Sequence, residues 1–265
     1  MKNTIIIIGA GIAGLRAALE VAKDPNSRII FLEKSVSVGG RVATRRLENT
    51  FVNHGTMQFG GLKRVIQSDP FATSLLQKNY FDTQATELPK RLKEELILNY
   101  TSKIEFKFKW EVSKVIGNEC VISVDGDIQR FDRLIMTAPS PQVERMTGIS
   151  LPDIKYHKTI VFFGLIDNAP ERFEMDATWS ERFFDLPNDE IMLAAEAKLN
   201  KSLKGFTIKK WRYARVARGL DASYLLLRRK VVMAGDAFDP KGEFNLGSSW
   251  LSGLNVGKAL LSKTF

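Results

Sequence analysis

The first 33 residues constrain the fold of this chain more than any other segment. Four isoleucines, Ile5–Ile8, lead directly into the motif Gly9-Ala10-Gly11-Ile12-Ala13-Gly14. A second apolar run over 29–32 ends in Glu33, nineteen residues after Gly14. A strand, a glycine turn, a helix and a second strand ending in an acid are the signature of a dinucleotide-binding βαβ unit.

Each glycine of this motif has a physical role in holding a dinucleotide. Gly9 makes the tight turn out of the strand, Gly11 lets the backbone approach a pyrophosphate, and Gly14 lets the helix pack close to the sheet. Free N–H groups at the helix start favour negative charge there. Glu33 is placed to accept hydrogen bonds from a ribose. The alternative is an α/β domain that uses its glycines only for a tight turn.

The composition fits a globular enzyme in a reducing compartment. The chain has 265 residues, of which 44% are apolar and 26% charged, enough for one large domain or two smaller ones. A single cysteine, Cys120, excludes an intramolecular disulfide, so we expect a cytoplasmic protein. Cys120 lies in a strand-like run and is interpreted as a small core residue. Two histidines and one cysteine do not favour a zinc site, and no metal is expected.

The chain is basic, with a formal net charge of +9 and a pI of about 9.6. This charge suits phosphate-bearing ligands and is compatible with weak nucleic-acid contact. A solvated basic surface explains it equally well because lysine and arginine are scattered, and we expect no nucleic-acid partner. No apolar run approaches eighteen residues, so no membrane span is expected. The apolar N-terminus carries glycines at nucleotide-binding spacing and is interpreted as mature structure, not a signal peptide.

Further elements follow from the apolar pattern of the first half of the chain. The first helix should extend to about residue 22, an irregular helical stretch should cover 62–79, and a helix should cover 88–96. Alternating apolar residues over 104–124 predict a small antiparallel meander, and 131–137 should return as a strand.

The stretch 149–211 changes character and is interpreted as a substrate domain. Strands are expected near 159–165 and 206–214, with a helix over 188–203 between them. Its aromatic residues are candidates for a pocket lining, with ordinary core as the alternative. They are Phe162, Phe163, Phe173, Trp179, Phe183 and Phe184. A buried strand over 230–234 and a last helix over 252–262 complete the prediction.

Several motifs occur in an order that matches a known family. After the glycine motif and Glu33 come Gly39-Gly40-Arg41, with Thr44-Arg45 close behind. Further along lie Ala138-Pro139, Trp211-Arg212-Tyr213-Ala214, Gly235-Asp236-Ala237-Phe238 and Leu251-Ser252-Gly253-Leu254. With its motifs in this order, the chain resembles the flavin amine oxidase superfamily and, within it, the renalase-like FAD-dependent oxidoreductases.

The resemblance implies a fold and a division into domains. The fold would be α/β, with a three-layer Rossmann-like FAD-binding domain that includes a β-meander. A smaller α+β substrate domain would complete an architecture like that of amine oxidases and p-hydroxybenzoate hydroxylase. The FAD-binding domain would comprise 1–60, 88–147 and 214–265, and the substrate domain 61–87 and 148–213.

The resemblance also implies the roles of individual residues around an extended FAD. The first glycine loop would hold the pyrophosphate, Glu33 the ribose, and Asp236 the ribityl or phosphate region. Backbone N–H groups of 247–250 would cap the flavin. The cofactor-binding residues would be Gly9, Ala10, Gly11, Ile12, Ala13, Gly14, Glu33, Lys34, Gly40, Arg41, Met57, Gln58, Phe59, Val112, Ala138, Pro139, Gly235, Asp236, Gly247, Ser248, Ser249 and Trp250.

One segment departs from the family pattern. Renalase-like chains show D-H-G-A-Q where this chain reads Asn53-His54-Gly55-Thr56-Met57, followed by Gln58 and Phe59. His54 is a candidate for the flavin-facing pocket, with a backbone-bonded loop histidine as the alternative. Trp211 and Tyr213 are the other catalytic candidates, and Trp250 joins them as a possible member of an aromatic pair facing the flavin.

The function that the resemblance implies is hydride transfer from a small-molecule substrate to FAD. That substrate would be a reduced nicotinamide-type dinucleotide, NAD(P)H-like or an isomer of one, and dioxygen would reoxidise the flavin. Oxidation of a small amine is the second enzymatic hypothesis. A non-catalytic FAD-binding sensor or assembly protein, and a colourless NAD-dependent dehydrogenase, are the further alternatives.

Overall fold

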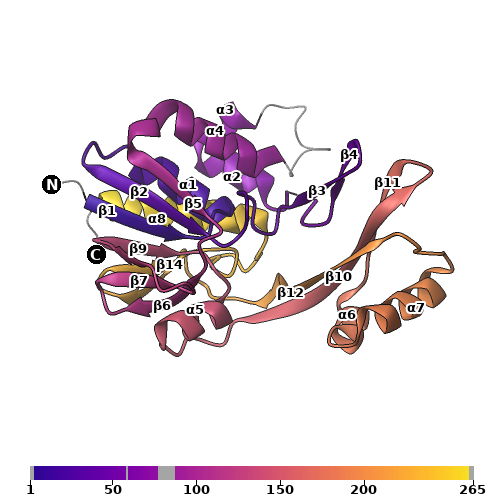
Figure 1. Ribbon diagram of the computed structural model, residues 1–265. Helices are drawn as coiled ribbons and strands as arrows, with labels where there is room; N and C mark the ends of the chain where they lie inside the picture. The colour runs from indigo at the N-terminus through magenta and orange to yellow at the C-terminus, as the bar shows by residue number, and fades with distance from the viewer. Residues whose placement is uncertain (1–2, 58, 77–86, 263–265) are drawn as a thin grey trace.

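A six-stranded sheet lies at the centre of the larger part of the molecule (Figure 1). The computed structural model describes residues 3–57, 59–76 and 87–262. From edge to edge the sheet consists of β13 (Leu225–Arg228), β14 (Val231–Met233), β9 (Arg133–Met136), β1 (Asn3–Ile8), β2 (Ser27–Glu33) and β5 (Ile104–Phe108). All neighbours pair in parallel except β13 with β14. The chain adds β2 and β5 on one side of β1 and later β9 and β14 on the other, so β1 lies at a topological switch point.

Two different layers cover the two faces of this sheet. One face packs against α1 (Ile12–Val21), α4 (Leu88–Tyr100) and α8 (Leu246–Leu261), joined by α2 (Leu62–Ser68) and α3 (Pro70–Leu75). The other face packs against α5 (Ser140–Thr147) and a meander of β6 (Val112–Ile116), β7 (Cys120–Ser123) and β8 (Ile128–Arg130). Alternate residues of β1 serve the two layers, Ile5 and Ile7 the helices and Ile6 and Ile8 the meander. The expected three-layer architecture is therefore confirmed.

A second, smaller sheet extends away from the first (Figure 1). The long strands β10 (Lys155–Ile166) and β12 (Thr207–Arg218) pair with each other, and β11 (Ala169–Glu174) pairs with β10, all antiparallel. Helices α6 (Ala177–Phe183) and α7 (Asn188–Leu199) pack on one face through Ile160 and Phe162. The hairpin of β3 (Thr44–Leu47) and β4 (Thr50–Asn53) contacts β10 and β11. His54, which follows β4, stacks on Phe163, on the sheet face opposite α6 and α7.

Among the elements that differ from the sequence-based expectation, three have a clear structural cause. The strand at 104–108 is not part of the meander; it is the edge strand β5 of the parallel sheet, where Phe106 stacks on Phe31 at 4.5 Å between ring centroids. The last helix begins at Leu246 because Asn245 and Ser248 form a reciprocal capping box before it. Helix α7 ends at Leu199, since Asn200 adopts a left-handed conformation.

Residues 61–76, which are expected in the substrate domain, contact the helices of the larger part of the molecule. Val65 and Ala72 pack into the core formed by α1, α4 and α8. Asp69, between α2 and α3, bonds to Arg16 of α1. The remainder of that predicted segment, 77–86, lies outside the described residues. Strand β12 crosses the predicted boundary at 213/214 without interruption, so that boundary lies within a single element.

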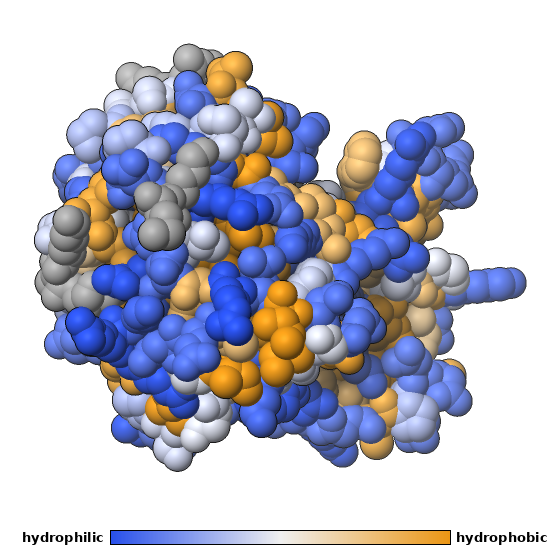
Figure 2. Space-filling model, turned by 60° about the vertical axis from the view of Figure 1, so that its left-hand side comes forward, coloured by the Kyte–Doolittle hydropathy of each residue, from blue (hydrophilic) through white to orange (hydrophobic). Residues whose placement is uncertain are grey.

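The surface of the molecule is mixed in character. Figure 2 shows apolar side chains in separate groups among polar ones on the face it displays. Within the described part of the chain, no helix combines the length and apolarity needed to cross a membrane.

Candidate functional site

The carboxyl ends of the parallel strands bring distant segments of the chain to one edge of the sheet. Gly9 follows β1, Glu33 ends β2, Thr137 follows β9 and Gly235 follows β14. The N–H of Thr137 donates to the Ile8 carbonyl at 2.9 Å, which places the Ala138-Pro139 segment beside the first glycine turn. Ligands of open α/β sheets bind at this edge, next to the switch point of the strand order.

The two predicted glycine segments meet at this edge. Gly9 has a φ of +97°, and a Cβ on Gly14 would lie 2.3 Å from the Gly9 carbonyl oxygen, so neither position suits a larger residue. The Gly39 N–H donates to the Ala10 carbonyl at 2.9 Å. A Cβ on Gly40 would lie 3.4 Å from Cα of Gly11. Bare backbone from both segments therefore lines one cradle at the start of α1.

The start of α1 presents polar hydrogens to this cradle. Its N-cap is Gly11, which has no side chain to accept from the first-turn N–H groups. An uncapped helix N-terminus favours an anion because of both its N–H groups and its macrodipole. The residues of the first turn, Ile12 and Ala13, are buried, so a ligand would meet their backbone at the helix end and not their side chains.

Glu33 is held rigidly beside the same turn. Its carboxylate is buried and accepts hydrogen bonds from the N–H groups of Ala10 and Ser35, each at 2.8 Å. A carboxylate has about four lone-pair sites, so acceptor capacity for two ribose hydroxyls is left. The N–H of Trp110 donates to the Glu33 carbonyl at 3.0 Å, which brings the segment leading to Val112 alongside. Lys34, the residue after Glu33, is exposed.

Arg41 connects the second glycine turn to the other end of the chain. Its guanidinium forms an ion pair of 2.6 Å with Asp236, which follows Gly235 at the end of β14. It also donates to the carbonyls of Tyr213 and Ala214 at 3.3 and 3.4 Å. Burial acts to lower the pKa of Arg41, but the Asp236 carboxylate more than offsets it, and the pKa lies above its ordinary value.

His54 lies where the hairpin meets the second sheet. Its ring stacks between Phe163 and Trp211, with centroid distances of 4.9 and 5.7 Å. The indole N–H of Trp211 donates to the His54 carbonyl at 2.8 Å, while the buried Nδ1 atom of His54 has no hydrogen-bond partner. Burial, followed by the charges of Lys209, Arg45 and Arg172, lowers the pKa of His54 from 6.5 to about 4. The imidazole is therefore neutral at neutral pH.

This depressed pKa predicts a pH dependence of stability. The unfolded chain takes up a proton at His54 near pH 6.5 and the folded chain only near pH 4. The free energy of unfolding should therefore fall by about 2 kcal/mol, allowing for the ring's partial exposure, as the pH drops through this window. His54→Gln should flatten that part of the profile in urea titrations at several pH values. The exposed His157→Gln variant is the control, and an unchanged slope for His54→Gln would contradict the assignment.

The aromatic residues expected to line a pocket do not do so as a group. Phe162, Phe173, Trp179, Phe183 and Phe184 pack with α6 and α7 in the core of the smaller part, so the alternative of ordinary core holds for these five. Only Phe163 faces the hairpin. Strand alternation accounts for the difference, because Phe162 and Phe163 point to opposite faces of the same sheet.

The other aromatic candidates lie in separate environments. Trp211 lies against His54, whereas Tyr213 contacts Tyr156 at 5.4 Å between ring centroids. Trp250 is fully buried and donates its indole N–H to Asp69 at 2.7 Å, so it forms no aromatic pair with Trp211 or Tyr213.

The start of α8 is already capped by the protein itself. The N–H of Gly247 donates to the Gly60 carbonyl at 2.8 Å, and those of Ser248 and Ser249 donate to Asn245. These three N–H groups are thus engaged, which differs from the expectation that they contact a flavin directly. The nearby Met57 is exposed and Phe59 packs against Trp250, while Gln58 lies outside the described residues.

Other residues of the site carry no motif and were not predicted. Arg172 of β11 donates to the Gly55 carbonyl at 3.2 Å and pairs with Glu174 at 2.6 Å. Lys209 places its ammonium 4.8 Å from the centroid of the Trp211 ring. The sequence signal for Lys209 is a local concentration of basic residues over 209–218, with Trp211 and Tyr213 between them.

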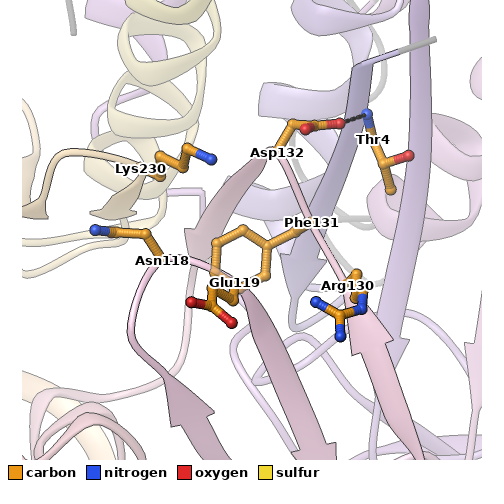
Figure 3. A pocket seen from close by; sticks show the side chains of 7 residues that line it. All are labelled: Thr4, Asn118, Glu119, Arg130, Phe131, Asp132 and Lys230. Atoms are coloured by element: carbon orange, nitrogen blue, oxygen red, sulfur yellow. Dashed lines mark hydrogen bonds between the residues drawn. The ribbon is translucent and has the colours of Figure 1, made fainter. Parts of the chain in front are cut away.

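A surface hollow elsewhere on the molecule is not part of this site. It has a volume of about 290 Å³ and is lined by Thr4, Asn118, Glu119, Arg130, Phe131, Asp132 and Lys230 (Figure 3). Thr4 and Lys230 lie at the starts of β1 and β14, so the hollow is at the amino edge of the sheet, opposite the glycine turns. In 3–57, 59–76 and 87–262, no group of three or more His, Cys, Asp or Glu side chains is arranged to hold a metal ion.

Comparisons with known sequences agree with the nucleotide-binding geometry. The Thi4 family matches residues 1–45, which contain β1, α1, β2 and both glycine turns. Protein anon-37Cs of Drosophila lebanonensis is 29% identical over 165 residues, 57% of this chain and 28% of that protein. Chloroplastic thiamine thiazole synthase of Arabidopsis thaliana is 50% identical over 39 residues, 15% of this chain and 11% of that protein. The matched segments therefore span less than a third of either relative.

A solved structure shares the fold over nearly the whole chain. It is the crystal structure of a provisionally assigned protoporphyrinogen oxidase from Exiguobacterium sp. 255-15, with a TM-score of 0.61, 12% identity and 99% coverage of both chains. At this identity the likeness concerns the fold alone, a mixed α/β architecture built around a parallel sheet. The expected fold class is confirmed, and the match of residues 1–45 to the Thi4 family agrees with a dinucleotide-binding unit that contains both glycine turns.

Proposed function

We propose that this chain is an FAD-dependent oxidoreductase of renalase type, whose substrate is a reduced nicotinamide-type dinucleotide or an isomer of one. Bound FAD would supply the chemistry, accepting hydride from a substrate carbon and passing electrons to dioxygen. A reducing cytoplasm is the compartment we propose, because Cys120 is an unpaired thiol.

The observation that carries the FAD assignment is the cradle formed by Gly11 and Gly40. A Cβ on Gly40 would lie 3.4 Å from Cα of Gly11, so the backbones of the two turns come close together beside the uncapped start of α1. A pyrophosphate fits this chemistry, because it is anionic and needs close backbone contact. Arg41 and Asp236, which come from opposite ends of the chain, form their ion pair at the same edge of the sheet.

Each residue at this edge has a distinct task in the proposal. The turns containing Gly9 and Gly40 hold the pyrophosphate, and Glu33 accepts from the ribose hydroxyls. The backbone before Val112, lying next to Glu33, is the adenine contact. Asp236 orients Arg41 and is not itself the phosphate ligand, because a carboxylate would repel that anion.

The substrate side of the proposal rests on charge. Arg172 and Lys209 carry positive charge beside the stacked His54, and their charges contribute to the low pKa of that ring. Such a face attracts a phosphate-bearing substrate and repels a small protonated amine, so it favours the dinucleotide over amine oxidation. His54 is neutral, so it can offer a hydrogen bond without adding charge. Hydride transfer itself requires no acid or base from the protein.

The proposal is tested by the spectrum of the purified protein and its bleaching under argon. Bound flavin should absorb in the blue, and NADH or its isomers should reduce it, whereas benzylamine should not. Reduction by benzylamine alone would replace the proposal with amine oxidation. Bound flavin that none of these compounds reduces would favour a non-catalytic FAD-binding protein, and a colourless protein that stays so with added FAD would exclude the flavin assignment.

A further inference from the structure

The sheet face opposite α6 and α7 carries a group of cations that the FAD cradle does not use. Phe163 of β10 lies between Arg172 of β11 and Thr207 of β12, and Val161 lies between Glu174 and Lys209. Because neighbours in register share a face, Arg172 and Lys209 point to the same side as Phe163. His54 and the hairpin of β3 and β4 approach from this side.

Two polar atoms on this face are buried and unpaired. Within the described residues, Nδ1 of His54 and Nε of Arg172 are shielded from solvent and have no hydrogen-bond partner. Buried polar groups in native proteins are nearly always satisfied, by protein, water or a ligand. Both atoms belong to residues that meet at Gly55, since Arg172 donates to the Gly55 carbonyl next to His54. Their unused capacity therefore points to a bound polar group at this place.

The charge of this face identifies the kind of group. Glu174 is already shared by Arg172 at 2.6 Å and Arg215 at 2.5 Å. Among the described residues, no carboxylate forms an ion pair with Lys209 or with Arg45 of the hairpin. Arg172 and Arg215 thus share the Glu174 carboxylate, while Lys209 on the same face and Arg45, whose charge acts on His54, add further positive charge. An anion is the ligand that this excess attracts.

We propose that His54, Arg172 and Lys209 form an anion subsite that binds the phosphate or pyrophosphate group of the substrate. Lys209 and Arg172 supply the positive charge, and Nδ1 of His54 donates to a phosphate oxygen when it carries the single proton of the neutral ring. The subsite is separate from the FAD cradle, which is built by the glycine turns. Its assignment to the substrate rests on the proposed function, whereas the binding of a phosphate anion does not.

Lys210 offers a matched control on the opposite face of the same strand. Its ammonium donates to the Leu186 carbonyl at 2.8 Å and lies 6.0 Å from the Phe184 ring, on the side of α6 and α7. Lys209→Gln and Lys210→Gln remove the same charge from the protein. A difference in pyrophosphate affinity between these two variants therefore reflects the local subsite and not the net charge of the protein.

The experiment titrates FAD-loaded protein with inorganic pyrophosphate and with NAD⁺, following tryptophan fluorescence and heat. We expect Lys209→Gln to weaken pyrophosphate binding about tenfold, Lys209→Arg to restore most of it, and Lys210→Gln to match the wild type. Unsaturable binding in the wild type, or equal affinities for the two glutamine variants, would overturn the subsite.

Flavin reduction separates this proposal from the proposed function. If NADH and its isomers reduce the flavin of Lys209→Gln with the wild-type KM, the assignment of the subsite to the substrate is wrong and the oxidoreductase assignment stands. If none of them reduces the wild-type flavin while pyrophosphate binding still depends on Lys209, the anion subsite stands and only the electron donor is wrong.

Discussion

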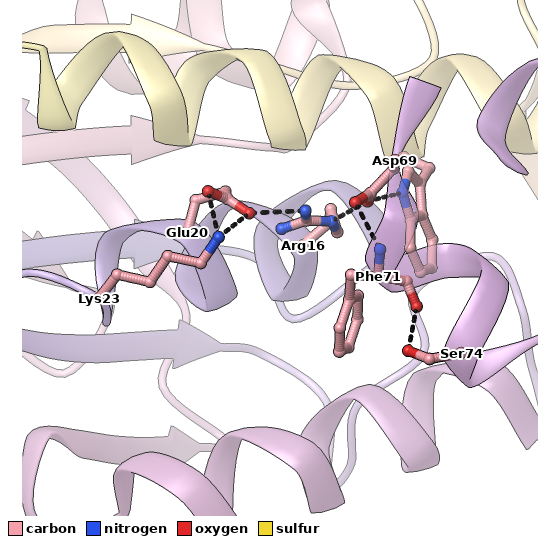
Figure 4. A network of polar contacts seen from close by, with 7 residues as sticks. Arg16, Glu20, Lys23, Asp69, Phe71 and Ser74 are labelled. Carbon is pink, nitrogen blue, oxygen red and sulfur yellow. Dashed lines mark hydrogen bonds and ion pairs between the residues drawn. The ribbon is translucent and has the colours of Figure 1, made fainter. Parts of the chain in front are cut away.

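Arg16→Ala is expected to lower the free energy of unfolding by about 3–5 kcal/mol, because it leaves buried carboxylates without their cation. The Arg16 side chain is 1% exposed and bonds to Glu20 and Asp69, each at 2.7 Å (Figure 4). Asp69 also accepts from the indole of Trp250. Burial acts to raise the pKa of Asp69, but the bond and charge of Arg16, together with the bonds from Trp250 and the Phe71 N–H, lower it below its ordinary value. The carboxylate is therefore charged, and Arg16 is its main partner.

The network links three segments that are far apart in the sequence. Arg16 lies in α1 directly after the glycine motif, Asp69 lies between α2 and α3, and Trp250 lies in α8. Losing the arginine should therefore loosen the packing of α8 on the nucleotide-binding helix. Urea denaturation of apo and FAD-loaded protein measures the loss in each state.

A matched variant controls for the loss of positive charge. Lys23 pairs with Glu20 in the same network at 2.8 Å, but its side chain is 56% exposed. Lys23→Ala should cost below about 1 kcal/mol, as solvated ion pairs do. If both variants unfold at the same urea concentration, the buried network contributes nothing beyond a surface pair.

The sequence predicted best where the determining interactions are local. The β1–α1–β2 unit follows from glycine spacing and apolar runs within about thirty residues, and the structure reproduces it. The strand at 104–108 was misplaced because alternating apolar residues suit an edge strand of a parallel sheet as well as a meander. The start of α8 was missed because Gly247, Ser248 and Ser249 read as a loop, whereas packing on α1 and the Asn245 cap make them helical.

Prediction of the site was limited in the same way, by interactions between residues that are far apart in the sequence. Arg41 and Asp236 were each expected near the cofactor, but nothing in a single sequence indicates an ion pair across 195 positions. Arg172 and Lys209 were missed for a related reason. Their side of the sheet depends on strand register and on which face α6 and α7 cover, and neither follows from the residues themselves.

Arg41→Ala should weaken FAD binding by about 2–4 kcal/mol, equivalent to roughly 30- to 1,000-fold in Kd. The guanidinium lies between the Gly40 turn and Asp236, and it also holds the carbonyls of Tyr213 and Ala214. Without it, the largely buried Asp236 carboxylate has no cation and faces the proposed pyrophosphate cradle, so repulsion adds to the lost contact. Flavin content after purification and fluorescence titration of apoprotein with FAD measure the effect.

Two companion variants separate this role from a general loss of charge. Arg46 lies on the exposed hairpin, and its hydrogen bond among the described residues is to the Glu48 carbonyl, so Arg46→Ala should retain FAD as the wild type does. Adding Asp236→Asn to Arg41→Ala should recover part of the affinity, because it removes the unpaired carboxylate while the lost contact stays lost. Normal flavin occupancy in Arg41→Ala would show that the ion pair is only structural, and a double variant no better than the single one would show that repulsion by Asp236 is not part of the effect.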